Sequence, residues 1–311
     1  MNKYNLYTLK DNKLIDILEF CGGINWSTDS ETVGMQLTFS SIKKLNFGNY
    51  INLKINDKDI FIGTVITIEQ NNNIYAYTCM DFARYLNKNK TIMQFNNIPA
   101  WIAMGQVCSK FSIKHDIPHN IITKITKIYK SQTLLDIIKD IGEIYTKETG
   151  KKLYMEMDGD IFKVKNDINL LKISTKFLLG NGATFKESIE NTITKVEVVS
   201  KDEKDTRIIS IVEDKKASET FGLVTEHIQL EENQNESQAY NIAEKYLKTH
   251  VSAESELTLD IIPIKNAELL RANRLVDFKL EKYNINSARL ITNCNCTLEN
   301  GVYKASITFK W

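Results

Sequence analysis

The final residues of the chain alternate between apolar and polar side chains. The apolar set comprises Tyr303, Ala305, Ile307, Phe309 and Trp311, and the polar set comprises Lys304, Ser306, Thr308 and Lys310. Successive side chains of a β-strand point to opposite faces of a sheet, so this period of two predicts a strand with one buried face. We expect this strand to complete a sheet, with no reactive cluster beside it.

Shorter segments of the same character fill about residues 1–90. The expected strands are 15–20, 35–39, 51–55, 60–69 and 74–79. Brief polar turns separate them at Gly22-Gly23, 56–59 and 71–73, and a short helix over 81–86 closes the region. Many short strands joined by brief polar turns predict a small antiparallel barrel or sandwich.

The hydrophobic period changes from about residue 91 to about residue 185. A helix is expected with Asn97 as its cap and Pro99 in its first turn. The apolar face of this helix comprises Trp101, Met104, Cys108 and Phe111. Later in the sequence of this region, segments 153–157 and 161–164 flank Asp158-Gly159, a pair suited to a type I′ hairpin turn.

A second helix in the same region has stronger markers. Ser131 or Thr133 caps its start, and Gly150 ends it. Its apolar face comprises Leu134, Leu135, Ile137, Ile138, Ile141, Ile144 and Tyr145. Two helices and a hairpin together predict a small α/β domain at 91–185.

Strands return in about residues 186–311. Segments 193–199 and 207–212 flank a charged turn at 201–205, and residues 257–261 and 276–280 alternate as half-buried strands do. Ser237 is the expected cap of a helix over 239–247. The expected fold class is therefore α+β and mainly β. Two small barrel or sandwich domains, at 1–90 and 186–311, flank the α/β domain, and the helix packs on the second of them.

Composition limits the classes of partner. Lys and Arg total 40 against 39 Asp and Glu, so the formal net charge is +1 and no global basic field exists to hold nucleic acid. We expect no sequence-specific nucleic acid partner. No segment approaches the ~20 apolar residues of a membrane span, so we expect no membrane insertion and a chain that folds in the cytosol. The 5 cysteines, an odd number, are expected to stay reduced.

Several stretches in order along the chain carry a resemblance to a known group of proteins. They are INWSTD at 24–29, MQLTF at 35–39, DFARYLNKNK at 81–90, ENTITKV at 190–196, SETFG at 218–222, the helix at 239–247 and TLENGVY at 297–303. In this order they resemble the XkdQ-like and late-control-D-like hub proteins of contractile phage tails and phage-tail-like bacteriocins. The chain departs from that group at 270–274, where a Pro-Gly turn is common, and at Cys294-Asn295-Cys296, where a His is common.

The resemblance implies a non-enzymatic structural protein without a cofactor. It implies two tube-type barrel domains per chain and a homotrimer with pseudo-sixfold symmetry. The implied partners are the tail tube protein, the central spike protein and other baseplate proteins. The implied place of synthesis is the bacterial cytoplasm, and the implied location is the baseplate of a virion or of a tail-like particle.

One histidine pair and one cysteine pair are candidate metal ligands. His115 and His119 have the spacing of zinc ligands on a helix, but Pro118 breaks a helix between them and a third ligand is missing. Cys294 and Cys296 would point to one face of a strand, where small half-buried side chains are the simpler interpretation. No metal site is expected.

A glycine-rich segment, two carboxylate pairs and two histidines are candidate catalytic or binding groups. Gly180-Asn181-Gly182 lacks the lysine and the following helix of a phosphate loop, so we expect a tight turn. Asp158 with Asp160, and Glu231 with Glu232, are carboxylate pairs of the kind that glycosidases use. Both pairs are expected in solvated loops, where no carboxyl group gains the raised pKa of a general acid. His227 and His250 are expected to be structural, so no catalytic residue is assigned.

Two hypotheses from different classes remain. The preferred one is a structural baseplate hub protein that joins the tail tube to the central spike. The alternative is a baseplate-associated cell-wall hydrolase or glycan-binding module. A hub should be an oligomer without activity on peptidoglycan, whereas a hydrolase should clear cell walls and lose that activity when one carboxylate is neutralised.

Overall fold

The computed structural model describes residues 2–166, 171–173, 176–200, 206–230, 236–276 and 288–311. The chain divides into two compact units. The first comprises Met1–Ala183 with Thr258–Phe309, and the second comprises Thr184–Leu257 with Lys310–Trp311. Within the part of the chain that the structure describes, no helix has both the length and the apolar character needed to span a membrane.

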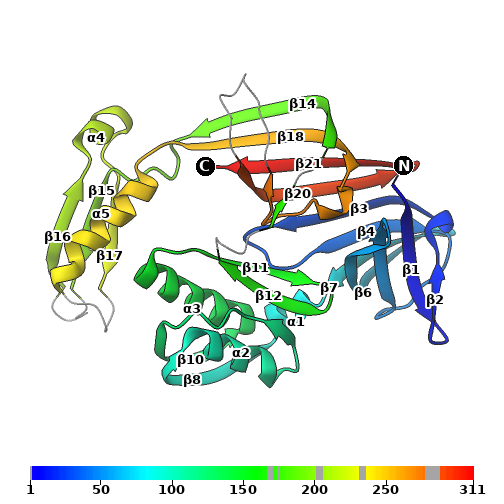
Figure 1. Cartoon of the computed structure of the whole chain (residues 1–311), viewed down its shortest axis with the longest axis horizontal. Coiled ribbons are helices and arrows are strands. Elements are labelled where there is room, and N and C mark those ends of the chain that lie inside the picture. Colours follow the sequence, from blue (N-terminus) through cyan, green and yellow to red (C-terminus); the bar gives the residue numbers. More distant parts are fainter. Residues whose placement is uncertain (1, 167–170, 174–175, 201–205, 231–235, 277–287) are drawn as a thin grey trace. The chain divides into compact units, whose positions relative to one another are not determined.

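The first unit is built around one 13-stranded sheet (Figure 1). Its strands follow the order β14-β18-β21-β20-β3-β4-β7-β6-β5-β1-β2, and β13 and β19 join it beside β20. The bounds are β1 Tyr4–Lys10, β2 Lys13–Asp16, β3 Cys21–Asp29, β4 Gln36–Ser41, β5 Tyr50–Ile55, β6 Lys58–Asn71, β7 Ile74–Asp81, β13 Lys172–Ile173, β14 Lys176–Ser188, β18 Glu254–Lys265, β19 Leu275–Val276, β20 Arg289–Glu299 and β21 Val302–Lys310. Figure 1 shows β1 and β2 running at a steep angle to β20 and β21, so the sheet curls strongly.

Strands from the two ends of the chain share this sheet. They join where β3 pairs with β20, with Trp26 opposite Cys296 and Ile24 opposite Leu298. The α+β, mainly β class is confirmed. The expected division at 1–90, 91–185 and 186–311 differs from the two observed units, because a period-two pattern reports which side chains face a core but not which strand is the neighbour.

Tight turns set the register of several hairpins. Positive φ angles occur at both residues of Asp11-Asn12 (50° and 58°), Asn56-Asp57 (53° and 62°) and Asn300-Gly301 (49° and 73°). Type I′ turns require this conformation, and their twist matches that of the strands that they join. The turn expected at 56–59 is confirmed at Asn56-Asp57, whereas Lys58 and Asp59 already belong to β6. The turn expected at Gly22-Gly23 is wrong, because both glycines lie inside β3.

The last strand has the buried face that its alternation predicts. Tyr303, Ala305, Ile307 and Phe309 are at most 4% exposed. The Tyr303 ring lies 5.1 Å from the ring of Trp26, across β20. Trp311 departs from the pattern: it follows the end of β21 and is 41% exposed.

Between β7 and β13 the chain forms what we call the α/β module, residues 83–166. Its elements are α1 Ala83–Lys88, β8 Lys90–Pro99, α2 Ala100–Lys110, β9 Lys114–Asp116, β10 Lys124–Thr133, α3 Leu134–Thr149, β11 Leu153–Asp158 and β12 Ile161–Asn166. Strands β8 and β10 form a two-stranded sheet, and β11, β12 and β9 form a three-stranded one. Helices α2 and α3 share a buried core with these strands, which includes Met104, Ile138 and Phe162.

Helix α3 is the element that the sequence predicts most closely. The Thr133 side chain accepts a hydrogen bond from the Asp136 amide at 3.1 Å, and Gly150 ends the helix in the left-handed conformation. The expectation for α2 is wrong at its start. Helix α2 begins at Ala100 and not after Asn97, because β8 continues through Pro99, which pairs with Lys124.

The β11–β12 hairpin forms around Asp158-Gly159 as expected. Gly159 has a φ of 63°, but Asp160 has no positive φ. A type I′ turn needs positive φ at both loop residues, so that turn type is wrong.

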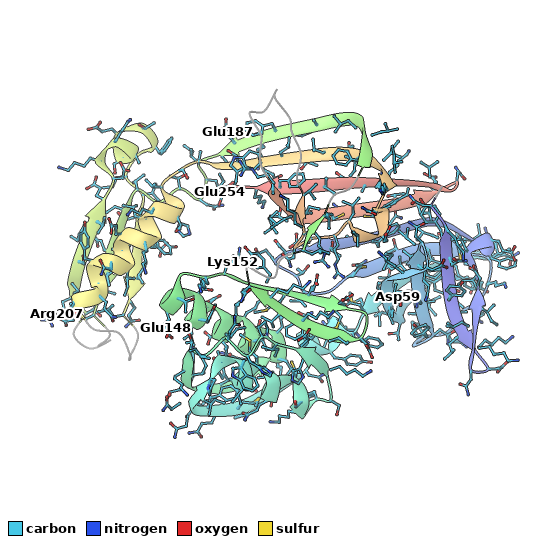
Figure 2. All side chains as sticks on the ribbon, viewed as in Figure 1. Asp59, Glu148, Lys152, Glu187, Arg207 and Glu254 are labelled. Atoms are coloured by element: carbon cyan, nitrogen blue, oxygen red, sulfur yellow. The ribbon has the colours of Figure 1, made fainter. Side chains whose placement is uncertain are left out.

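The second unit has its own small core. Its elements are β15 Lys195–Val199, β16 Ile208–Glu213, α4 Lys215–Phe221, β17 Thr225–Gln229 and α5 Ala239–His250, and its sheet order is β16-β15-β17. Helix α5 packs through Ala243 and Leu247 on Val196 and Val198. In Figure 2, Glu187 on β14 and Glu254 on β18 mark where the chain enters and leaves this unit.

Two expectations change in the second unit. Helix α5 belongs to this unit and not to the sheet that contains β21. Ser237 does not cap it, because residues 236–238 form a 3-10 turn and Gln238 precedes the first helical residue. The charged turn expected at 201–205 and most of the strand expected at 276–280 lie outside the described residues.

Candidate functional site: a buried charge cluster

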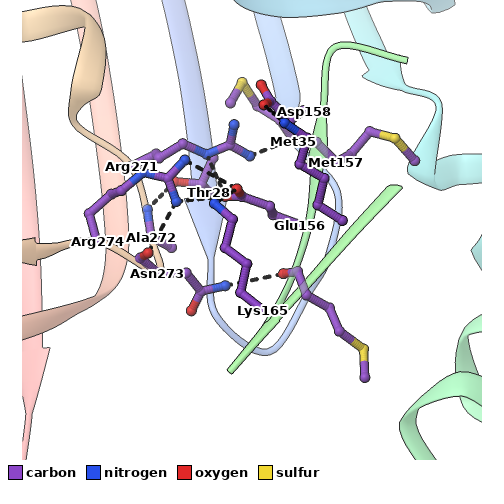
Figure 3. A network of polar contacts seen from close by, with 12 residues as sticks. Thr28, Met35, Glu156, Met157, Asp158, Lys165, Arg271, Ala272, Asn273 and Arg274 are labelled. Carbon is purple, nitrogen blue, oxygen red and sulfur yellow. Dashed lines mark hydrogen bonds and ion pairs between the residues drawn. The ribbon is translucent and has the colours of Figure 1, made fainter. Parts of the chain in front are cut away.

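Four charged side chains meet inside the first unit, where the β11–β12 hairpin lies against segment 270–274 (Figure 3). They are Glu156, Lys165, Arg271 and Arg274, and we call them the charge cluster. The Glu156 side chain is 5% exposed and the Arg274 side chain 7% exposed. Charges are rarely buried this far unless they are paired, so the geometry of the pairs decides what the cluster does.

Glu156 is at the centre of the cluster. Its Oε2 lies 2.7 Å from Nη1 of Arg274, and its Oε1 lies 3.2 Å from Nη2 of the same guanidinium group. Lys165 Nζ donates to Oε1 at 2.5 Å, and Arg271 Nε lies 3.5 Å from Oε2. Two oxygens facing two guanidinium nitrogens form a bidentate pair, which fixes orientation as well as attraction.

Backbone groups extend the same contact. Arg271 Nη2 donates to the Met157 carbonyl at 2.9 Å, and Asn273 Nδ2 donates to the Met155 carbonyl at 3.1 Å. On its other side, the Ala272 amide donates to Thr28 Oγ1 on β3 at 2.9 Å. Segment 270–274 therefore connects the hairpin of the α/β module to the large sheet, as Figure 3 shows.

The cations hold Glu156 in its charged form. Burial alone would raise its pKa, but the charges of Arg271 and Arg274 and the hydrogen bonds from Arg274 and Lys165 outweigh burial and lower the pKa to about 2. A carboxyl group that stays ionised in this way cannot serve as a general acid near neutral pH. The arrangement can hold two segments of chain together, and it offers no proton to a reaction.

A second buried carboxyl group lies near the cluster. Asp81, at the end of β7, accepts hydrogen bonds from the amides of Met35 at 2.8 Å and Ala83 at 3.0 Å. Burial raises its pKa to about 7, although these two amides and the charge of Arg271 act in the opposite direction. Asp81 ties the start of α1 to the loop before β4.

Asp81 makes the stability of the chain depend on pH. Its folded pKa of about 7 is above the ordinary value of 3.8, so its stabilising contribution is complete below pH 3.8 and is lost as the pH rises through 7. We expect Asp81→Asn to remove this loss. The free energy of unfolding of the variant, relative to that of the wild type, should therefore rise by on the order of 4 kcal/mol from pH 4 to pH 9. Urea unfolding of both proteins across this range measures the difference. Parallel pH curves for the two proteins would contradict the assignment.

No local pattern in the sequence identifies the charge cluster. Glu156 and Arg274 are 118 positions apart, so no local spacing connects them. Two local signs exist in the sequence. Glu156 interrupts the apolar pair Met155 and Met157, and Arg271 and Arg274 lie close together in segment 270–274. Only the fold shows that these two places meet.

The candidate metal ligands lie apart from the charge cluster. His115 is in β9, and His119 follows it in a non-helical segment, with its ring tilted by 32° against the ring of Trp101 and 4.3 Å between the ring centres. Both histidines line an open hollow of about 420 Å³ beside α2. Among the described residues, no group of three or more His, Cys, Asp or Glu side chains is placed to hold a metal ion.

Cys294 and Cys296 point to the same face of β20, as expected. Their sulfur atoms are 3.4 Å apart, and Cys296 Sγ is 3.2 Å from the Tyr303 hydroxyl. Both side chains are fully buried rather than half-buried. The hydrogen bond with Cys296, with burial, raises the pKa of Cys294 well above its ordinary value, so this thiol is not a nucleophile at neutral pH.

The tight turn expected at Gly180-Asn181-Gly182 is wrong. These residues lie inside β14, and a Cβ atom at Gly182 would come within 2.5 Å of Oδ2 of Asp260 on β18. A larger residue at position 182 would therefore require the exposed Asp260 side chain to move.

The carboxylate candidates in the β11–β12 turn are ion-paired and half exposed. Asp158 pairs with Lys163 at 2.7 Å, and Asp160 pairs with Lys114 at 2.5 Å. Their side chains are 45% and 48% exposed, so the solvated environment expected for this pair is confirmed. Glu231 and Glu232 lie outside the described residues.

The two remaining histidines lie in the second unit. His227 Nε2 lies 3.0 Å from Oε2 of Glu197, which also pairs with Lys195. His250, the last residue of α5, stacks on Tyr246 with 4.1 Å between the rings. Both histidines contact neighbouring secondary structure.

Comparison with known proteins assigns a family to this fold. The profile of the family described as YQBQ-like matches residues 24–310, and the chain belongs to this family. No curated protein matches the chain by sequence.

Solved structures share the fold over the whole chain. The 43 kDa tail protein of prophage MuSo2 from Shewanella oneidensis has a TM-score of 0.74 at 16% identity, over 98% of this chain and 98% of that one. A tail protein from Neisseria meningitidis MC58 has a TM-score of 0.74 at 11% identity, over 99% and 96%. The E. coli c3393 protein, a type VI secretion component similar in structure to the T4 tail proteins gp27 and gp5, has a TM-score of 0.54 at 9% identity, over 93% and 73%. The resemblance to phage tail proteins drawn from the sequence is confirmed.

Proposed function

We propose that this chain is a structural subunit of the baseplate hub of a contractile tail or tail-like particle. The observation that carries the proposal is the match to the prophage MuSo2 tail protein, which covers 98% of both chains. The fold that the chain shares with the E. coli secretion component, which is itself similar in structure to the T4 tail proteins gp27 and gp5, supports a role in a tail-like assembly. The tail tube protein, the central spike protein and other baseplate proteins are then the partners.

The open ends of the large sheet support a ring of identical subunits. Strands β2 and β14 are the two end strands of the sheet path in the described part of the chain. An end strand presents unpaired backbone groups, and joining it to a strand of another copy removes the exposed edge. Because the two ends differ, repeating one heterologous contact closes a ring. Each copy contributes two sets of strands to its large sheet, the N-terminal β1 to β7 and the C-terminal β14, β18, β20 and β21. Three copies then give the pseudo-sixfold symmetry that joins a sixfold tube to a threefold spike.

Exposed side chains on β14 support the same contact. Leu178 is 56% exposed and Leu179 is 54% exposed. Burial of one such leucine side chain contributes ~1.5–3 kcal/mol. A ring repeats this contact in each subunit.

The oligomeric state tests the ring. We expect native mass spectrometry to find a trimer, and Leu178→Lys to shift it to monomer by placing a charge at the contact. Ile74→Lys is the matched control, because Ile74 is 52% exposed at the start of β7 and lies away from both end strands. A monomer at all wild-type concentrations, with spike protein present, would refute the ring.

Absence of catalysis is the second part of the proposal. We assign the carboxylates of Asp158 and Asp160 no chemical role, because each is paired with a lysine at the surface. The expected result is that wild type, Asp158→Asn and Asp160→Asn release no soluble fragments from purified peptidoglycan. Release by the wild type that either substitution abolishes would replace the hub by the alternative, a cell-wall hydrolase.

A further inference from the structure

One face of the α/β module carries positive charge that the rest of the module does not neutralise. Residues 88–133 contain 7 lysines and a single acidic residue, Asp116, although the whole chain has a net charge of only +1. Lys114 and Lys127 pair with acidic residues, and Lys110 donates to Thr91. The remaining lysines are Lys88, Lys90, Lys124 and Lys130, all exposed and without an ion pair to any described residue.

These lysines lie on or beside the two-stranded sheet of β8 and β10. The inner face of this sheet buries Phe95, Ile125 and Tyr129 against the module core. The outer face exposes Ile92 (66%) and Ile128 (53%). Ile128 is opposite Gln94, so Ile92 is its diagonal neighbour on the other strand. We call this outer surface, with Lys90, Lys124 and Lys130, the basic ribbon.

We propose that the basic ribbon is a docking surface for an acidic segment of a partner protein, in which carboxylates alternate with apolar side chains. Carboxylates would pair with the unneutralised lysines, and the apolar side chains would cover Ile92 and Ile128. Both β8 and β10 are end strands of their sheet in the described structure, so an extended segment has a backbone edge to pair with.

Chemistry of the surface favours protein over the other anionic partners. The aromatic rings of both strands, Phe95 and Tyr129, are buried, so the ribbon offers no platform on which bases could stack. Two diagonal isoleucines are too small an apolar face for an amphipathic element that inserts into a lipid surface. An alternating acidic strand uses both the lysines and the isoleucines.

Synthetic peptides and the full-length chain test this surface. One nine-residue peptide alternates Glu with Val, and a second alternates Ser with Val. We expect the acidic peptide to bind at least ~tenfold more tightly than the neutral one, with affinity that falls as salt rises from about 50 to 300 mM. Lys124→Glu combined with Lys130→Glu should weaken binding ~tenfold or more, and Ile128→Ser should weaken it without changing the salt dependence.

A matched control separates the ribbon from bulk charge. Lys215→Glu with Lys216→Glu makes the same change in net charge on α4 in the second unit, where both lysines are exposed. It should leave peptide affinity within ~twofold of the wild type. Equal losses in both double variants, equal affinity for the neutral peptide, or tighter binding of single-stranded DNA or of phosphatidylserine vesicles would overturn the proposal. The assay does not depend on the ring, because the trimer and the peptide are measured separately.

Discussion

Glu156→Gln should destabilise the folded chain by ~3–5 kcal/mol at neutral pH, since it leaves the guanidinium groups of Arg271 and Arg274 buried without a counter-charge. Glutamine has nearly the same shape and can still accept a hydrogen bond from Lys165, so the loss reports the missing charge rather than a cavity. Urea unfolding measures the difference. Arg271 and Asn273 also bind the backbone carbonyls of the hairpin, so a disturbed segment 270–274 weakens the whole contact with β11 and β12. In the variant, hydrogen exchange should therefore show faster opening of β11 and β12 than of β3 and β4.

The acid limb of the stability curve gives an independent measurement. Glu156 has a folded pKa of about 2, below its ordinary value of 4.5, so its contribution is present above pH 4.5 and is lost as the pH falls through 2. This contribution amounts to about 3 kcal/mol in the wild type and is absent from Glu156→Gln. The difference between the two proteins should therefore shrink between pH 4.5 and pH 2.

Asp160→Asn is the control for Glu156→Gln. It breaks the pair with Lys114, in which both side chains are about half exposed or more, and should cost at most ~0.5 kcal/mol. If Glu156→Gln cost no more than this control, the charge cluster would not connect the module to the sheet.

Ile138→Asp should unfold the α/β module before the rest of the chain. Ile138 is fully buried on the inner face of α3, in the core that also contains Met104 and Phe162. The substitution removes apolar contacts and places a carboxylate where it has no cation, which costs on the order of 5 kcal/mol. This is comparable to the total stability of many domains. Thermal unfolding with hydrogen exchange of α2 and α3 amides is the measurement.

Two milder variants make the Ile138 result specific. Ile138→Val keeps the site apolar and should cost ~0.5–1.5 kcal/mol. Glu143→Asp changes an exposed position of the same helix and should cost less than ~0.5 kcal/mol. Unchanged thermal stability of Ile138→Asp would mean that the assigned inner face of α3 is wrong.

Local elements were predictable wherever a few neighbouring residues contain all the information. Helix α3 needs only its apolar stripe, the Thr133 cap and Gly150, and β21 needs only its alternation. Errors occurred where a distant strand changed a local preference. The composition of Gly180 to Gly182 suggests a turn, but the segment is a strand because it pairs with β18 in the large sheet.

Sequence alone determined the mainly β class, the helix and hairpin of the α/β module and the resemblance to tail proteins. The tertiary structure decided that β3 pairs with β20, that residues 184–257 form a separate unit and that Glu156 meets Arg274 across 118 positions. The physical reason is the range of the interactions. Backbone preference and side-chain period act over a few residues, whereas strand partners and buried ion pairs depend on the path of the whole chain.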